Sequence, residues 1–192
     1  MTQVISLTSR SFTRILIMCA MVSSLLAAGI AQAETLTSTR IQSFLDTRDD
    51  LAGFDDDYPG LQQASEEIRD MTSPLSSAIP ALEQFPEARK HLEKTVTEHG
   101  FDSVEDWANV GDRIILAQIA ISMQDMSAEE RAMSEEMMSA DYGEDMPEYM
   151  KERAREMAAG ARAMRSAAEA VPPEDIEAVR PFMNQLDPEE YK

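Results

Sequence analysis

Methionine is the residue type whose number and placement are best suited to chemistry in this chain. There are 14 methionines among 192 residues, and nine of them fall between residues 123 and 164. A thioether sulfur is a soft ligand that suits Cu(I) better than hard cations. Met133, Met137 and Met138 are close enough in sequence to face one ion, and Met146 follows across a loop. These four residues are the candidate ligands of a Cu(I) site.

The same residues have a structural interpretation that the sequence favours over copper binding. Methionine is unbranched and flexible, so it fills irregular gaps in helical cores. Met150, Met157 and Met164 follow the spacing of packed helices and not that of a ligand cluster. The region has no Met-x-Met repeat and no mixture of His and Met. We therefore expect these methionines to pack in the core, and we assign neither a cofactor nor a committed metal site.

Two acidic clusters offer oxygen ligands of the kind that Ca²⁺ prefers. In one of them, Asp141, Asp145 and Glu152 match positions 1, 5 and 12 of a helix-loop-helix calcium loop, but Met146 stands where that loop requires glycine. The other flanks a Gly-Phe turn and has no calcium-loop spacing; it consists of Asp49, Asp50, Asp55, Asp56 and Asp57. Both clusters are predicted to be solvated acidic turns.

No sequence motif for catalysis is present. His91 and His99 lie eight residues apart and form no zinc-binding pattern, so we expect surface histidines. The chain lacks a G-x-S-x-G elbow, a phosphate-binding loop and a dinucleotide fingerprint. We therefore predict that the protein is not an enzyme. A hydrolase that uses paired carboxylates is the alternative, because acid pairs are common in so acidic a chain.

The first 33 residues have the pattern of a cleaved secretory signal peptide. Arg10 and Arg14 make the first segment basic, an apolar stretch covers residues 15–30, and Ala31-Gln32-Ala33 is a small-x-small cleavage site. We therefore predict cleavage after Ala33 and a periplasmic or secreted protein. The alternative is an uncleaved N-terminal membrane anchor, for which the apolar stretch is barely long enough.

Cleavage would change the chemistry of the remaining chain. It would remove Cys19, the single cysteine, so that residues 34–192 contain no thiol and no disulfide. The net charge would change from −19 to −21, because two arginines leave and no acid does. Such a surface repels nucleic acid and anionic lipid, and it suits cationic partners. No later segment is long and apolar enough to give a stable membrane span.

Composition and periodicity predict an all-α protein. Ala, Glu, Met, Gln, Arg and Leu are abundant and are good helix formers. We predict a helical bundle of roughly six to eight helices in a single domain, 34–192, with a loose tail over 187–192. The expected helices cover about 38–51, 61–71, 74–84, 86–99, 103–126, 127–140, 145–170 and 173–181.

The segment Ile114–Ile121 is expected to lie at the centre of the bundle. It is apolar almost all round, and a helix without a polar face is buried on all sides. Asp102 or Ser103, with Glu105 or Asp106 three residues on, is placed as in a capping box, which begins a helix over 103–126. A β-strand is the alternative, given the isoleucines, but the capped start favours the helix.

A second stripe predicts a helix-packing seam. Its residues alternate in spacing between four and three, as in a heptad repeat, and alternate large with small side chains. We expect this seam to pack antiparallel against a helix of the same chain, a protein partner or a second copy in a homodimer. Its members are Met150, Ala154, Met157, Ala161, Met164, Ala168 and Val171.

In layout the chain resembles small helical periplasmic stress chaperones and metal-resistance proteins that carry L-T-x-x-Q repeats. It shares with them a signal peptide, a similar length and a methionine-rich helical composition. The nearest approach to the marker is Leu36-Thr37-Ser38-Thr39-Arg40, where arginine replaces glutamine, and it occurs once. No site residues are carried over. The expected function is that of an exported interaction protein or chaperone-like module that acts by binding.

Overall fold

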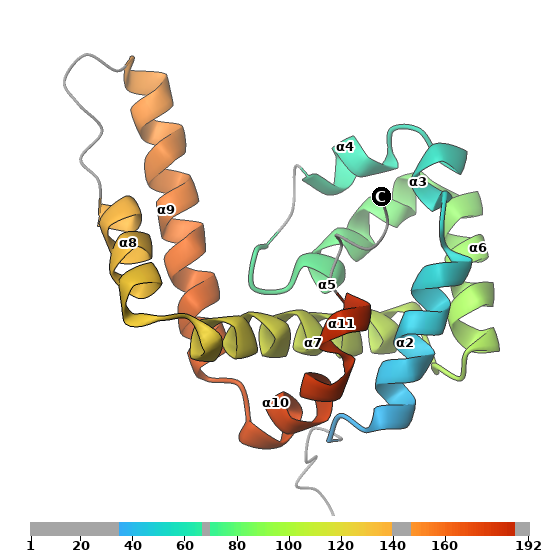
Figure 1. Cartoon of the computed structure of the whole chain (residues 1–192). Helices are drawn as coiled ribbons and strands as arrows, with labels where there is room; N and C mark the ends of the chain where they lie inside the picture. The colour runs from blue at the N-terminus through green and yellow to red at the C-terminus, as the bar shows by residue number, and fades with distance from the viewer. Residues whose placement is uncertain (1–34, 67–69, 140–146, 187–192) are drawn as a thin grey trace, which may run out of the picture. The chain divides into compact units, whose positions relative to one another are not determined.

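The computed structural model describes residues 35–66, 70–139 and 147–186. Every regular element in these ranges is helical, so the prediction of an all-α fold is confirmed (Figure 1). The predicted signal peptide with Ala33, and the predicted loose tail, lie outside the described residues. The elements are α2 (Ser38–Asp50), α3 (Phe54–Asp57), α4 (Leu61–Glu66), α5 (Pro74–Ala78), the 3₁₀ helix η1 (Ile79–Gln84), α6 (Pro86–Glu98), α7 (Val104–Asp125), α8 (Ala128–Ser139), α9 (Glu148–Glu169), α10 (Pro173–Val179), the 3₁₀ helix η2 (Arg180–Phe182) and α11 (Met183–Leu186).

Capping side chains set the starts of α7 and α8. The Ser103 hydroxyl accepts a hydrogen bond from the Asp106 N–H and begins α7. Ser127 and Glu130 form a full capping box at α8, because each side chain accepts from the other residue's N–H, at 3.2 and 2.7 Å. Both helix starts agree with the sequence prediction.

Gly100 lies just past the end of α6, where glycine is common. Its φ of +84° lies in the left-handed region, which glycine adopts without steric cost. The Gly100 N–H donates to the Thr97 carbonyl and the Phe101 N–H to the Val96 carbonyl. Phe101 and Val96 are both buried, and this apolar contact is the usual companion of the Schellman motif.

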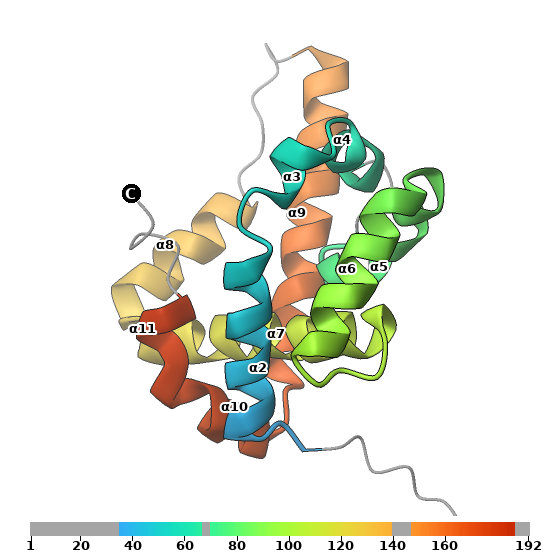
Figure 2. The same ribbon diagram turned by 90° about the vertical axis from the view of Figure 1, so that its right-hand side faces the viewer.

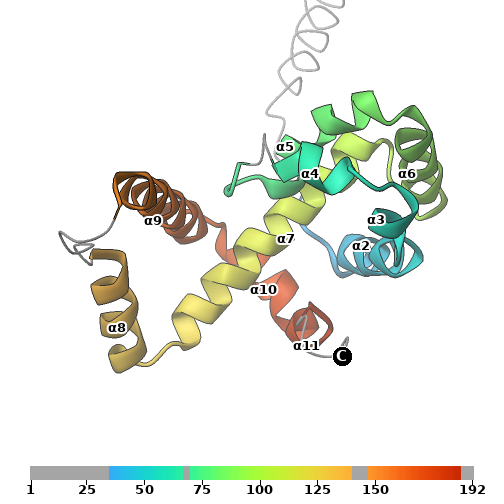
Figure 3. The same ribbon diagram turned by 90° about the horizontal axis from the view of Figure 1, so that it is seen from above.

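Helix α7 is the central element. It contacts α2, α5, α6, α9 and α10, and seen from above the N-terminal helices gather around its first half while α8 and α9 lie beside its second half (Figure 3). Between Ile114 and Ile121 every residue is buried or half-buried. The prediction of a central buried helix near residues 103–126 is therefore confirmed, and the strand alternative is wrong.

One expected helix is divided in two. The segment 74–84 forms α5 and then η1, because Pro80 has no N–H to donate to an α-helical hydrogen bond. The sequence analysis also missed α3, which forms one turn inside the acidic segment after Gly53. None of the described helices combines the length and the apolar character needed to cross a bilayer.

Two buried carboxylates hold α10 and α5 to the central helix. The Arg113 guanidinium donates to both carboxylate oxygens of Asp175, at 2.8–3.0 Å, and the Leu36 N–H also donates to Asp175. α10 lies against both α2 and α7 (Figure 2). On another side of α7, the Asp112 carboxylate accepts from the Leu75 and Ser76 N–H groups at the start of α5. Neither contact leaves a signal in the local sequence.

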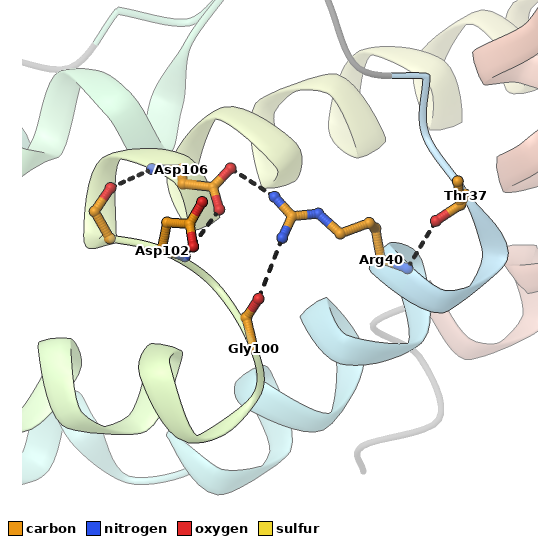
Figure 4. Close-up of polar contacts among 6 residues, drawn as sticks. Thr37, Arg40, Gly100, Asp102 and Asp106 are labelled. Atoms are coloured by element: carbon orange, nitrogen blue, oxygen red, sulfur yellow. Dashed lines mark hydrogen bonds and ion pairs between the residues drawn. The ribbon is translucent and has the colours of Figure 1, made fainter.

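Arg40 joins α2 to the turn before α7 (Figure 4). Its guanidinium donates to the Asp106 carboxylate and to the Gly100 carbonyl, and it lies 4.6 Å above the centre of the Phe101 ring. Burial raises the pKa of Asp106, but the hydrogen bonds from Arg40 and the Asp102 N–H, with the charge of Arg40, hold that pKa below its ordinary value. The polar contacts of Arg40 and Asp106 join α2 to α7 and to the turn before it, so we assign these two residues a structural role.

Candidate functional site: a methionine-lined groove

Methionine is absent from the core of the described residues. Every fully buried apolar side chain there is Leu, Ile, Val, Phe or Ala. Among the residues whose side chains are described, six large apolar ones are exposed, and five of them are methionines: Met71, Met126, Met133, Met150 and Met157, with Tyr149 as the sixth. The expectation that Met150 and Met157 pack in the core is therefore wrong. The heptad spacing indicated that these residues share one face of α9, but other parts of the chain cover only the C-terminal part of that face.

Four methionines line one cleft, which we call the methionine groove. Its volume is about 610 Å³, within the range of pockets that hold small molecules or side chains. Met71, Met123, Met126 and Met164 contribute thioethers. The remaining lining residues are partly apolar and partly polar or charged: Ile119, Ala120, Gln124, Arg131, Ser134, Ala161, Arg165, Ala168, Glu169 and Ile176.

Helices α7, α8 and α9 form most of the groove, and Ile176 of α10 and Met71 complete it. The C-terminal half of α7 supplies Ile119 and Met123, the capping box at Ser127 turns the chain into α8, and α9 lies beside α8 and contacts α7 (Figure 1). Gly160 in α9 allows Met71 to approach, because a Cβ at this position would lie only 2.5 Å from the Met71 sulfur. The absence of a side chain at Gly160 therefore helps to shape one wall.

The charged side chains of the groove are mostly neutralised by one another. Arg165 of α9 pairs with Glu169 and with Glu135 of α8, at 3.2 Å each, and these hydrogen bonds raise the pKa of Arg165, that to Glu169 most. The Arg131 guanidinium donates to the Gln124 carbonyl at 3.2 Å. Arg165 and Arg131 already form hydrogen bonds within the chain. A ligand in the groove would therefore contact mainly thioether and alkyl groups.

The predicted copper ligands are not gathered into one described site. Met133 is 63% exposed on α8 and does not line the groove, although its neighbour Ser134 does. The side chains of Met137 and Met138, and all of Met146, lie outside the described residues. The predicted seam divides: Ala161, Met164 and Ala168 line the groove, whereas Met150 and Met157 are exposed.

The other candidate groups have separate structural partners. His91 lies beside the Tyr58 hydroxyl, and His99 lies 2.8 Å from the Asp50 carboxylate. Asp55, Asp56 and Asp57 are exposed on α3, and Asp141 and Asp145 fall outside the described residues. Within the described part of the chain, no three His, Cys, Asp or Glu residues are arranged to hold a metal ion.

A second cavity lies on the other side of α7. Its volume is about 630 Å³, and Phe44, Phe54, Trp107 and Gln118 are among its lining residues. Trp107 stacks on Phe44 with 5.6 Å between ring centres, and its indole N–H is buried without a hydrogen-bond partner. The single tryptophan therefore reports on this cavity and not on the methionine groove.

Sequence reasoning missed Met71, Met123 and Met126 as site residues. The enrichment in methionine was visible, but Met71 comes about fifty positions before Met123, and the pattern gives no sign that they meet. No protein family, curated protein or solved structure matches this chain. The site must therefore be interpreted from its own chemistry.

Proposed function

We propose that this protein is an exported, chaperone-like binding protein whose methionine groove takes apolar side chains of other proteins. The observation that carries the proposal is the lining of one groove by four methionines. Methionine side chains are flexible and polarisable, so a surface built from them adapts to partners of different shape. Met133, Met150 and Met157 are also exposed on α8 and α9, but they lie outside the groove.

The charge of the chain supports a particular class of partner. A net charge of −19 keeps a protein soluble while it holds apolar surface, and it attracts cationic chains. An amphipathic helix with an apolar face and lysines on the other face matches an apolar groove in a chain of negative net charge. We therefore expect cationic amphipathic segments to bind more tightly than anionic ones.

The test is binding of a fluorescein-labelled helical peptide made of leucine and lysine. We expect saturable binding that weakens as salt rises, because the charges are screened. Changing Met71 and Met126 together to glutamine should raise Kd at least about tenfold, since polar amides replace the thioethers. Met133→Gln is the matched control, because Met133 is equally a surface methionine but lies outside the groove.

Two results would contradict the proposal. The first is equal binding by the double variant and by the control. The second is a change in Trp107 emission on binding, because Trp107 lines the second cavity and the peptide would then be bound there. A circular dichroism spectrum of each variant checks that the helices are retained.

Export is supported by the order of basic segment, apolar segment and Ala31-Gln32-Ala33. The measurement is mass spectrometry of the protein recovered from the producing cells. A chain that begins at Glu34 in the periplasmic or secreted fraction is expected. A full-length chain in the membrane fraction would instead support the N-terminal anchor.

Cu(I) binding is a second candidate function, and the four thioethers in one groove favour it. Cu(I) is titrated against a competing chelator with wild-type protein, with Met123, Met126 and Met164 changed to leucine, and with Met133, Met137 and Met138 changed to leucine. Loss of affinity in either triple variant would support a thioether site and show where it lies. Weak affinity that neither triple variant changes would end this hypothesis.

A further inference from the structure

The location of the methionines has a chemical consequence beyond packing. Met133 and Met157 are 63% and 65% exposed, and Met71, Met126 and Met150 are 37–44% exposed. Met123, Met164 and Met183 are half-buried, and no methionine in the described ranges is fully buried. The chain thus places its thioethers where a dissolved oxidant reaches them and keeps them out of its core.

Peroxides oxidise such thioethers directly. A sulfur lone pair attacks one oxygen of hydrogen peroxide, the S–O bond forms as the O–O bond breaks, and the second oxygen leaves as water after a proton moves to it. The sulfur loses two electrons and the peroxide gains them. The product, methionine sulfoxide, is polar where the thioether was apolar, and sulfoxide-reducing enzymes return it to methionine.

We propose that the five exposed methionines are sites of reversible sulfoxide formation, and that oxidation of Met71 and Met126 switches off apolar binding in the methionine groove. The second part rests on the proposed function, and the first does not. Both residues line the groove and are exposed, so they join the reactive surface to the binding surface. The core keeps most of its packing after oxidation, because none of its fully buried side chains in the described residues is a methionine and only half-buried Met183 packs against it.

The experiment treats the wild-type protein with hydrogen peroxide and follows each methionine by peptide mass spectrometry. Met133 and Met157 should be oxidised first, Met71, Met126 and Met150 next, and Met123 and Met164 last. The midpoint of thermal unfolding should move by no more than a few degrees, while Kd for the leucine-lysine peptide should rise at least about tenfold. Methionine sulfoxide reductases of both stereospecificities should restore binding.

Leucine variants assign the effect to particular sulfurs. With Met71 and Met126 changed to leucine, the groove stays apolar and contains no exposed thioether, so peptide binding should survive peroxide. With Met133 and Met157 changed to leucine, binding should remain sensitive, because the groove residues are intact.

Each outcome separates the two proposals. Oxidation that starts at the half-buried methionines, or that unfolds the protein, overturns the assignment of modification sites. Wild-type binding that survives peroxide, or loss of binding by the Met71 and Met126 leucine variant, overturns the switch. Absence of peptide binding before treatment overturns the proposed function, while the order of oxidation and the unfolding midpoint still decide the modification sites.

Discussion

At the scale of single residues, Asp175 is the most consequential charged group. Its carboxylate is buried, accepts two-pronged hydrogen bonds from Arg113 and lies 62 residues from it in the chain. Changing one member of a buried ion pair costs more than the pair contributed, because the groups that remain lose hydrogen bonds that the fold was built around. Such pairing of distant residues cannot be found in one sequence, because each side chain alone is an ordinary surface charge.

We predict that Asp175→Asn lowers the free energy of unfolding by about 3–5 kcal/mol. Urea unfolding followed by circular dichroism measures the change. Glu174→Gln is the control, because Glu174 is the exposed neighbour on the same helix and should change stability by less than about 0.5 kcal/mol. Equal effects of the two substitutions would show that the Arg113 contact contributes nothing specific.

Asp106 gives the stability of the protein a dependence on pH. Its folded-state pKa lies below the ordinary value of 3.8 because the hydrogen bonds from Arg40 and the Asp102 N–H outweigh burial. A carboxyl group with a lowered folded pKa stabilises the fold above its ordinary pKa. That stabilisation is lost as the pH falls through the lower, folded-state pKa.

We therefore predict that Asp106→Asn destabilises the protein by about 1–3 kcal/mol at pH 7, as for a hydrogen bond to a charged group. The gap to wild type should narrow steadily below about pH 4 as the wild-type carboxyl is protonated. Thermal unfolding at several pH values measures this gap. Asp102→Asn is the control, because only the backbone of Asp102 contacts Asp106. A gap of constant size down to strongly acidic pH would contradict the assignment.

At the scale of helices, most starts and ends were predicted well because their causes are local, whereas residues 70 and 71 of the helix expected over 61–71 are not helical. Ser103, Ser127 with Glu130, and Gly100 act on groups within three to five positions of themselves. Burial of a helix face was predicted well only for α7. Residues 114–121 of that helix are apolar almost all round, so they must be buried whichever way the helix is turned. For α9 the Met/Ala stripe indicated a face, but the sequence does not say how far along the helix a neighbour covers it.

Two helical glycines test how close packing depends on a missing side chain. A Cβ at Gly111 of α7 would meet Leu75 and lie 2.5 Å from an atom of the Phe44 ring, and Phe44 is stacked on Trp107. A Cβ at Gly160 of α9 would instead meet the sulfur of Met71, the mobile part of a flexible and exposed side chain.

We predict opposite effects of alanine at these positions. Gly111→Ala should destabilise by about 1–2 kcal/mol, because overpacking costs more than the gain in helix propensity. Gly160→Ala should be neutral or stabilising by up to about 1 kcal/mol, since Met71 can move aside. Chemical unfolding of both variants measures the difference, and destabilisation of equal size would refute the distinction.

At the scale of the whole molecule, most of the described methionines lie outside the segments that build the core, with Met71 and Met183 as the exceptions. The core cluster is built from residues between Leu36 and Ile121 and from Val179 and Leu186. α8 and most of α9 contribute no side chain to it, although they supply exposed methionines and part of the groove. The sequence contained the unusual composition of this region, but composition alone does not distinguish a methionine-filled core from a methionine-covered surface.

This separation predicts unequal local stability. Elements with few buried apolar contacts open without global unfolding, so their amides exchange with solvent more readily. Backbone amides of residues 128–139 and 148–158 should therefore exchange at least about tenfold faster than those of 108–121 in native-state hydrogen exchange followed by mass spectrometry. Saturation with the leucine-lysine peptide should slow exchange in α8 and α9 and leave α7 almost unchanged, because α7 is already held by the core. Uniform protection across the three segments would mean that α8 and α9 belong to the cooperative unit of the core. The adaptability that the methionine groove is proposed to use would then have no structural basis.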